Sequence, residues 1–128
     1  MDNDPLILHG LKTCDTCRKA RQWLRERARP VELRDFHDTP PTADEIALWA
    51  DAMGGGLKGR LKLLNKRSRT WRDLTPEQKA MAGDEAALTE LLIRYPALIK
   101  RPLFTGGGLR QALQGFDDRI KGELMAMR

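Results

Sequence analysis

The sequence predicts an α/β fold, and three features of the chain lead to that class. A short apolar run near the start is followed by a charged segment with helical spacing, and then by a segment in which apolar and polar residues alternate. The middle of the chain carries helical patterns alone. Near the end, glycine-containing turns flank short apolar segments, as in a β-hairpin. The expected order is strand, helix, strand, a helical block, a hairpin and a last helix.

The first three elements form a strand–helix–strand unit. Leu6–Leu8 is an apolar run that leads to Gly10 and fits a buried strand. Asp15–Arg27 has apolar residues at helical spacing, and Pro30 follows its end. Val31–Phe36 alternates apolar and polar residues, as a half-buried strand does. The connection is long enough for the two strands to run parallel.

The middle of the chain predicts helices only. Thr42 precedes Glu45 by three residues, which is the spacing of a capping box at a helix N-terminus. Gly54–Gly56 ends this helix. Pro76 follows Thr75 at the first turn of another helix. Helices are expected from Thr42, over Leu57–Leu64, from Thr75 and from Asp84.

The end of the chain predicts a hairpin and a helix. Pro102–Thr105 fits a strand, and Gly106–Gly108 supplies a turn. Residues 109–113 are expected to run back beside that strand. After a further turn at Gly115, Asp117–Met127 carries apolar residues at helical spacing.

Composition excludes some classes of protein. The 128 residues are 41% hydrophobic and 32% charged, which suits a globular chain with a core. No apolar run approaches the roughly 20 residues of a membrane helix, and the acidic start does not resemble a secretion signal. We therefore expect a cytoplasmic protein without a membrane partner. In a reducing compartment, two cysteines spaced Cys-x-x-Cys favour redox or metal chemistry over a permanent disulfide.

The net charge of +5 is unevenly distributed. Ala52–Arg72 contains no acidic residue and seven basic ones. Apolar residues interrupt this basic run, so we expect mainly the solvated face of a helix. Binding of a small anion or of a macromolecular partner stays open, but nucleic acid is not an expected partner.

The two cysteines occupy the start of the first predicted helix. Cys14 lies in the turn after the first strand, where unpaired backbone N–H groups and the helix dipole stabilise a thiolate. Lys12 adds positive charge, and Thr13 offers a hydroxyl donor. Cys17 lies almost one turn further along, where it is more buried but still reaches Cys14. This pattern predicts Cys14 as the nucleophile and Cys17 as a resolving thiol.

Two other interpretations of the cysteines carry less weight. A structural zinc site requires four ligands, and only His9 and His37 remain as nitrogen ligands, at no recognised spacing. We therefore expect no metal. A purely structural role is also possible, because buried thiols are common in protein cores.

Three ordered motifs resemble the ArsC/Spx/YffB family, and most closely its YffB branch. They are CDTCRKARxWL from Cys14, LLNKRSRTWR from Leu63 and PALIKRPL from Pro96. The resemblance implies a thioredoxin-like, glutaredoxin-like mixed sheet with an inserted helical subdomain. The whole chain, 1–128, would be one domain, with a core of about 5–38 and 96–128 and an insertion of about 40–95.

The resemblance also implies a glutathione-linked thiol–disulfide oxidoreductase. Cys14 would be the catalytic thiolate, Arg67 and Arg101 would serve an anionic site, and Pro102 would be the cis-proline that faces the thiol. Together with Lys12 and Thr13, these residues would bind glutathione or the substrate. No cofactor would stay bound. Glutathione would be a co-substrate, the physiological partner would be glutathione or a glutathione-linked thiol protein, and the substrate would be a small anion or a disulfide.

Two alternatives remain within the same family. Cys14 and Cys17 could instead form the switch of an Spx-like regulator that binds RNA polymerase. An arsenate reductase is the weaker alternative. Such enzymes carry a third arginine downstream of the Arg-Pro pair, and this chain has Gln114 where that arginine would align.

Overall fold

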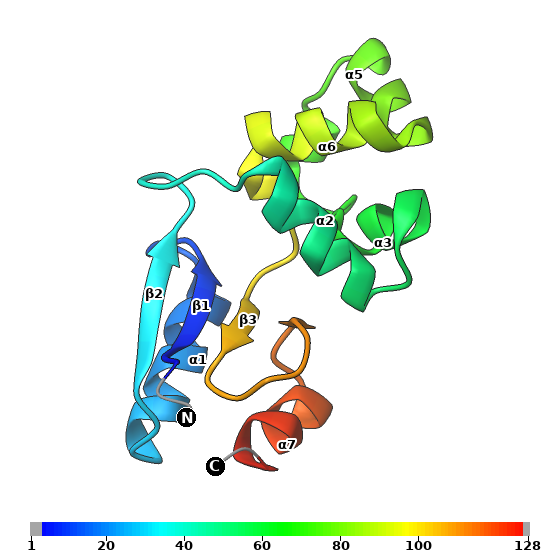
Figure 1. Cartoon of the computed structure of the whole chain (residues 1–128). Helices are drawn as coiled ribbons and strands as arrows, with labels where there is room; N and C mark the ends of the chain where they lie inside the picture. The colour runs from blue at the N-terminus through cyan, green and yellow to red at the C-terminus, as the bar shows by residue number, and fades with distance from the viewer. Residues whose placement is uncertain (1–3, 127–128) are drawn as a thin grey trace. The chain divides into compact units, whose positions relative to one another are not determined.

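The computed structural model describes residues 4–126 and divides them into two compact units. One unit contains the chain up to Thr39 and again from Arg101 onward, and the other is Pro40–Lys100. Figure 1 shows strands in the first unit and only helices in the second. The expectation that the whole chain forms one domain stays a prediction.

The first unit is built on a mixed four-stranded sheet. Its strands are β1 (Leu6–Gly10), β2 (Val31–Asp35), β3 (Leu103–Gly106) and β4 (Leu113–Gln114), in the order β2-β1-β3-β4. β1 and β2 are parallel, as the strand–helix–strand pattern predicted, while β3 is antiparallel to both β1 and β4. The α/β fold class is confirmed.

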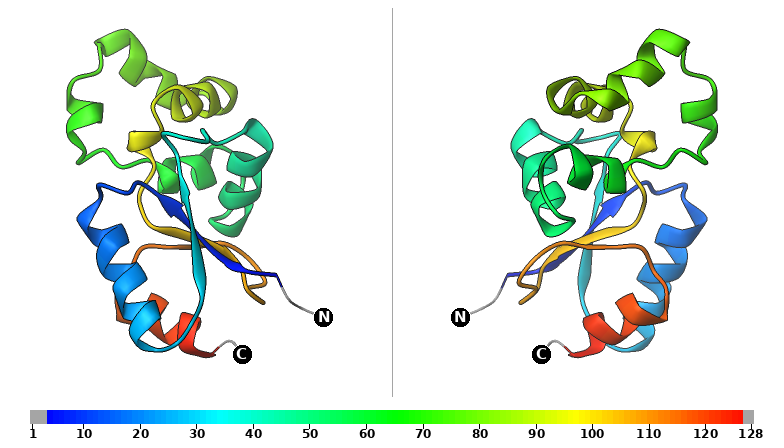
Figure 2. Two further views of the ribbon diagram at one scale, coloured as in Figure 1. Left: turned by 90° about the vertical axis from the view of Figure 1, so that its left-hand side faces the viewer. Right: turned by 90° about the vertical axis from the view of Figure 1, so that its right-hand side faces the viewer.

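Two helices cover one face of this sheet, α1 (Asp15–Glu26) and α7 (Asp118–Ala126). Both contribute to one core with β1 and β3, and Figure 2 shows them on the same side of the strands. The core contains Leu6, Leu8, Cys17, Ala20, Leu24, Phe104, Ile120 and Leu124. Trp23 is only half-buried and meets Phe116 edge to face, with ring centroids 5.6 Å apart.

A buried polar cluster ties three strands together. His9 on β1 is 5% exposed. Its Nδ1 lies 3.0 Å from a guanidinium nitrogen of Arg34 on β2, and since arginine can only donate, Nδ1 accepts. The Nε2–H of His9 then donates to the Thr105 hydroxyl on β3, at 2.7 Å. His9 therefore has a structural role in this sheet.

A left-handed residue ends α1. The backbone N–H of Arg29 donates to the Leu24 carbonyl and that of Ala28 to the Arg25 carbonyl, which together form a Schellman motif. Ala28 occupies the position that is usually glycine, with φ 54°. The chain then turns into β2.

The second unit contains five α-helices and two short 3₁₀ helices. They are α2 (Ala43–Ala52), α3 (Gly56–Leu63), α4 (Arg69–Arg72), α5 (Pro76–Ala80), η1 (Met81–Gly83), α6 (Glu85–Arg94) and η2 (Pro96–Leu98). The predicted capping box of Thr42 and Glu45 is present on α2, and a second one forms on α5. Gly59 on α3 lies so close to Ala50 that a Cβ there would overlap the backbone oxygen of Ala50.

Some details of the sequence prediction are wrong. The returning strand is shorter than the expected residues 109–113, because only Leu113–Gln114 pairs with β3 and Leu109 closes a turn with Gly106. The short helix α4 was not expected. The basic run is not wholly solvated, since Arg60 is buried and donates to the Thr89 hydroxyl at 2.7 Å. Met127, the predicted end of the last helix, lies outside the described residues.

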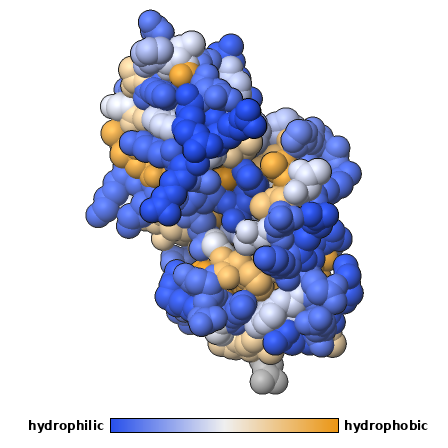
Figure 3. Space-filling view, turned by 180° about the vertical axis from the view of Figure 1, so that it is seen from behind, coloured by the Kyte–Doolittle hydropathy of each residue, from blue (hydrophilic) through white to orange (hydrophobic). Residues whose placement is uncertain are grey.

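One face of the molecule is largely polar. Figure 3 shows mostly hydrophilic side chains on the face seen from behind the view of Figure 1. Among residues 4–126, no helix has both the length and the apolar character needed to cross a membrane.

Candidate functional site

The candidate site begins where β1 ends. The chain leaves the strand at Gly10, and the backbone N–H of Cys14 donates to the Leu11 carbonyl at 3.1 Å. The Cys14 carbonyl then accepts the first bond of α1 from the N–H of Arg18, at 3.0 Å. Cys14 is therefore the N-cap residue of α1, as the sequence predicted. Its sulfur lies at the end of the helix where backbone donors are unpaired.

Asp35 holds the loop that precedes Cys14. One carboxylate oxygen accepts from the backbone N–H of Lys12 at 2.8 Å, and the other accepts from that of His37 at 2.7 Å. Burial alone would raise the pKa of Asp35, but these N–H donors outweigh it and lower the pKa. The carboxylate thus fastens the thiol loop to the end of β2. Sequence reasoning missed Asp35, although an acid at the end of the neighbouring parallel strand was a usable signal.

The surroundings of Cys14 favour its thiolate. Burial raises the pKa of this half-buried thiol, but three groups together outweigh burial and lower the pKa below its ordinary value. They are the backbone N–H of Cys17, the Cys17 side chain and the Arg101 guanidinium. A thiolate accepts hydrogen bonds far better than a thiol, so these contacts strengthen when Cys14 ionises.

Cys17 has the opposite character. Its side chain is 1% exposed and packs into the core of the first unit. Burial, followed by the nearby charge of Cys14, raises the pKa of Cys17 to about 12, so it is a neutral thiol at physiological pH. Gly10 makes room for it, because a Cβ at position 10 would overlap the Cys17 sulfur.

Arg101 and Pro102 approach the thiols from the start of β3. Arg101 is half-buried, and its charge acts on both Cys14 and Cys17. The Arg101–Pro102 peptide bond is cis, as the resemblance implied. Pro102 is buried, and its carbonyl accepts from the N–H of Gly115 at 2.8 Å.

The other predicted site residues, apart from Pro102, have exposed side chains. Lys12 and Thr13 lie in the thiol loop with exposed side chains, and the Lys12 ammonium pairs with Asp38 at 3.3 Å. Arg67 belongs to the unit Pro40–Lys100, where it is exposed between α3 and α4. The structure therefore groups Cys14, Cys17 and Arg101 directly, while the participation of Lys12, Thr13, Arg67 and Pro102 stays a prediction.

This arrangement is suited to nucleophilic sulfur chemistry. It combines a thiol of lowered pKa, a guanidinium beside it and a second thiol within reach. A mixed sheet with a helix that begins at such a cysteine defines a thioredoxin-like protein. In the part of the chain that the structure describes, no three His, Cys, Asp or Glu residues group in a way that could hold a metal ion.

Comparison with known proteins places the chain within one family. The model of the ArsC family matches residues 9–119, and the chain belongs to that family. The match begins in β1, before the thiol loop, and ends in α7, so it includes both units.

Individual relatives agree with this assignment. The uncharacterized protein YusI of Bacillus subtilis is 34% identical over 102 residues, which are 80% of this chain and 84% of the relative. The global transcriptional regulator Spx of Listeria innocua is 29% identical over 98 residues, or 77% of this chain and 71% of the relative. A solved structure of a YffB protein superposes with a TM-score of 0.79 at 31% identity, covering 93% of this chain and 97% of that one.

Proposed function

We propose that this protein is a glutathione-linked thiol–disulfide oxidoreductase in which Cys14 is the nucleophile. The observation that carries the proposal is the lowered pKa of Cys14 beside Arg101 at the N-terminus of α1. Only the thiolate attacks a disulfide, so a lowered pKa increases the reactive fraction at neutral pH. The coarser assignment, a thioredoxin-like protein of the ArsC family, already holds.

The reaction would proceed in two balanced steps. The Cys14 thiolate attacks the glutathione sulfur of a mixed disulfide, which breaks the S–S bond, forms a Cys14–glutathione disulfide and releases the substrate as a thiolate. A glutathione thiolate then attacks the glutathione sulfur on Cys14. This second step restores the Cys14 thiolate and releases oxidised glutathione. Overall one glutathione is consumed: the substrate sulfur passes from disulfide to thiol, and the sulfur of the incoming glutathione passes from thiol to disulfide.

The predicted binding residues fit an anionic tripeptide. Glutathione carries two carboxylates, and an arginine fork such as that of Arg67 or Arg101 suits a carboxylate. Lys12 and Thr13 would contact the peptide beside the thiol, and Pro102 would shape the wall opposite the sulfur. The proposal needs no bound cofactor, and it places the protein in the reducing, cytoplasmic setting expected from the sequence.

The pKa of Cys17 favours glutathione over Cys17 as the resolving thiol. In the mixed disulfide Cys14 has lost its charge, which removes one of the causes that raise the pKa of Cys17. Burial, the largest cause, remains. A buried thiol of high pKa is a slow nucleophile at neutral pH. We therefore propose a mechanism in which Cys14 alone is essential.

The test is turnover of a cysteine–glutathione mixed disulfide, followed through glutathione reductase and NADPH. The wild type is compared with Cys14→Ser and with the control Cys17→Ala. We expect loss of turnover only in Cys14→Ser. If Cys17→Ala also abolishes turnover in a folded protein, a dithiol mechanism replaces this one. If neither turnover nor rapid alkylation of Cys14 by iodoacetamide is found, the catalytic proposal fails.

An Spx-like switch is the second candidate, because the two thiols lie within interaction distance and the regulator Spx is among the relatives. In that case a Cys14–Cys17 disulfide would change binding to RNA polymerase without turnover. A pull-down with the polymerase α subunit, under reduced and oxidised conditions, tests it. Capture that depends on both cysteines would favour the switch, and absence of capture would exclude it. Arsenate reduction remains the weakest candidate, because Gln114 stands where the third arginine would align.

A further inference from the structure

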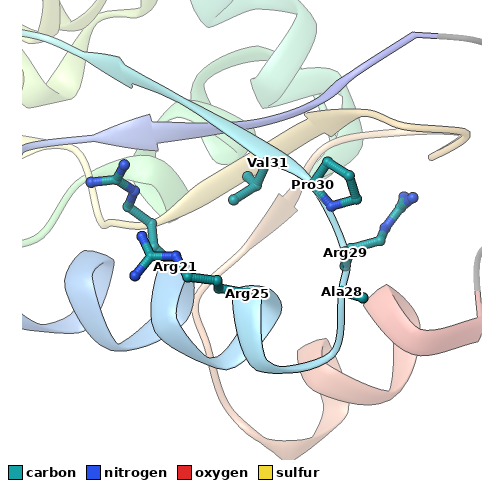
Figure 4. Close-up of a pocket in the computed structure, with 6 residues that line it drawn as sticks. All are labelled: Arg21, Arg25, Ala28, Arg29, Pro30 and Val31. Atoms are coloured by element: carbon teal, nitrogen blue, oxygen red, sulfur yellow. The ribbon is translucent and has the colours of Figure 1, made fainter.

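A second cationic site lies at the opposite end of α1 from Cys14. A pocket of about 340 Å³ is lined by Arg21, Arg25, Ala28, Arg29, Pro30 and Val31 (Figure 4). With a rise of 1.5 Å per helical residue, Arg21 and Arg25 lie roughly 10 and 16 Å along the axis from Cys14. In Figure 4 both side chains leave successive turns of α1 and extend toward the same side of Val31.

The charges of this pocket are unbalanced. None of its three arginines pairs with a carboxylate among residues 4–126. By contrast, ion pairs are formed elsewhere by Arg18, Arg27, Arg60 and Arg69. Within residues 4–126, the Arg25 side chain donates only to the neutral amide oxygen of Gln22, at 3.0 Å. Like charges at positions i and i+4 of a helix repel each other. An anion between Arg21 and Arg25 would remove this repulsion.

Two of the arginines that line the pocket also carry a donor without an acceptor. The Nε atoms of Arg21 and Arg29 are shielded from solvent, and neither has a hydrogen-bond partner in the described part of the chain. A buried polar group without a partner is rare and requires an explanation, for which a bound ligand is one of the standard reasons. Both atoms belong to residues that line the same pocket.

The pocket is also held in shape by its backbone. The Schellman motif fixes Arg25, Ala28 and Arg29 relative to one another, and a second guanidinium nitrogen of Arg29 donates to the Gly107 carbonyl at 2.8 Å. The carbonyls of Leu24 and Arg25 are occupied by backbone N–H groups, so they do not face a ligand as free acceptors. Because these carbonyls already accept hydrogen bonds, the partial negative charge of the helix C-terminus repels an anion less strongly.

We propose that this pocket binds a small organic phosphate. Arginine forks match the geometry of a phosphate group, whose charge would balance Arg21 and Arg25. Ala28, Pro30 and Val31 supply an apolar wall for the organic part of the ligand. A volume of this size lies at the small end of the range for small-molecule sites. The site is separate from Cys14 and does not depend on the proposed redox reaction.

The test observes the arginine Nε–H groups directly by ¹H–¹⁵N NMR of the full chain. The labelled protein is titrated with phenyl phosphate, with inorganic phosphate, with neutral benzyl alcohol and with sodium chloride at matched ionic strength. We expect saturable shifts of the Arg21 and Arg29 Nε–H signals with phenyl phosphate, and weaker binding of inorganic phosphate. Benzyl alcohol and sodium chloride should not shift the Nε–H signals of Arg21 and Arg29.

Variants separate a built site from general basicity. Arg21→Gln and Arg25→Gln should each weaken phenyl phosphate binding by at least about tenfold, the usual effect of losing a charged hydrogen bond. Arg110→Gln removes the same charge from an exposed loop and should leave binding unchanged, as should Cys14→Ser. The proposed site would be overturned if Arg110→Gln weakened phenyl phosphate binding as much as Arg21→Gln does. It would also be overturned if sodium chloride shifted the Nε–H signals as much as phenyl phosphate does. If inorganic phosphate bound as tightly as phenyl phosphate, the proposal that the ligand has an organic part would be overturned.

Discussion

Two cysteines three positions apart have opposite chemistry in this protein. Cys14 is half-buried at the start of α1, where a backbone N–H and Arg101 lower its pKa. Cys17 is packed in the core, where burial raises its pKa to about 12. The spacing brings the two thiols together, but the environment of each decides which one reacts.

Removing the cation beside Cys14 tests its role at the level of one residue. Arg101→Gln should raise the pKa of Cys14, because the hydrogen bond and the positive charge that stabilise the thiolate are lost. The measurement is the rate of alkylation by iodoacetamide as a function of pH. The midpoint should move to higher pH, and the rate at pH 7 should fall.

The matched control for this variant is Arg110→Gln, which removes an exposed arginine from the same unit. Its alkylation profile should coincide with that of the wild type. If both variants shift the midpoint equally, the pKa of Cys14 responds to net charge and not to Arg101.

Cys17 predicts a loss of stability in alkaline solution. Its pKa is about 12 in the folded protein and near the reference value of 9.0 in the unfolded chain. Above pH 9 the unfolded state therefore binds fewer protons than the folded state. The stabilising contribution of Cys17 is complete below pH 9 and is lost as the pH rises toward 12. The free energy of unfolding should fall by about 1.4 kcal/mol per pH unit from this residue.

Urea unfolding at pH 9 to 11 measures that slope in the wild type and in Cys17→Ala. The variant lacks the titrating thiol, so its free energy of unfolding should fall less steeply. Cys14 opposes this slope only near pH 9, because its lowered pKa makes its contribution complete once the pH is well above its unfolded value of 9.0. Parallel slopes for the two proteins would contradict the assignment.

At the scale of elements, the end of α1 carries a measurable strain. Ala28 has a φ of 54°, a left-handed conformation that costs an L-residue roughly 1–2 kcal/mol. Ala28→Gly should remove that cost, while the greater freedom of glycine in the unfolded chain offsets about 0.4–1 kcal/mol. The net gain should be about 0.5–1 kcal/mol in the free energy of unfolding, measured in urea.

The same substitution in an ordinary helical position is the control. Ala47 lies inside α2, and Ala47→Gly should lower stability by about 1 kcal/mol. The two Ala→Gly changes should thus have opposite signs. A loss of stability in Ala28→Gly would mean that the cap does not strain the chain.

Local signals predicted most of the elements, and non-local pairing accounts for the main errors. The capping box of Thr42 and Glu45 depends on a few neighbouring residues, so the sequence reveals it. The length of β4 depends on which residues meet Phe104 across the hairpin, and no local pattern encodes that register.

The residues of the candidate site fall into the same two groups, those that a local pattern reveals and those that depend on the fold. The position of Cys14 at a helix start follows from local pattern, whereas Arg101 was found only through family resemblance. Asp35 and the arginines of the α1 pocket were missed. Their roles depend on partners brought together by the fold, such as the backbone of Lys12 for Asp35 and Gly107 for Arg29.

At the scale of the whole molecule, each unit has its own close packing. In Pro40–Lys100, Gly59→Ala would place a Cβ against the Ala50 backbone and should cost about 1–3 kcal/mol. Gly83→Ala is the control, because nothing lies near a Cβ at that position. Urea unfolding should show the loss only in Gly59→Ala.

The alkylation rate of Cys14 adds a second measurement on the same variants. Because Gly59 belongs to the helical unit, folded Gly59→Ala should keep the Cys14 rate of the wild type at pH 7. Equal unfolding free energies for the two glycine variants would contradict the packing described for α2 and α3. A changed Cys14 rate in folded Gly59→Ala would show that the helical unit tunes the thiol.

The interrupted first unit has a consequence for synthesis on the ribosome. The helical unit is continuous, so all of its residues emerge before β3 does. Cys14 and β1 emerge first, but Arg101 and β3, the antiparallel neighbour of β1, arrive only after the helical unit. Domains generally fold as their residues emerge, from the N-terminus onward. A nascent chain that stops short of Arg101 therefore carries Cys14 without its cation, and the reactive thiolate is assembled only after the whole helical unit and Arg101 have emerged.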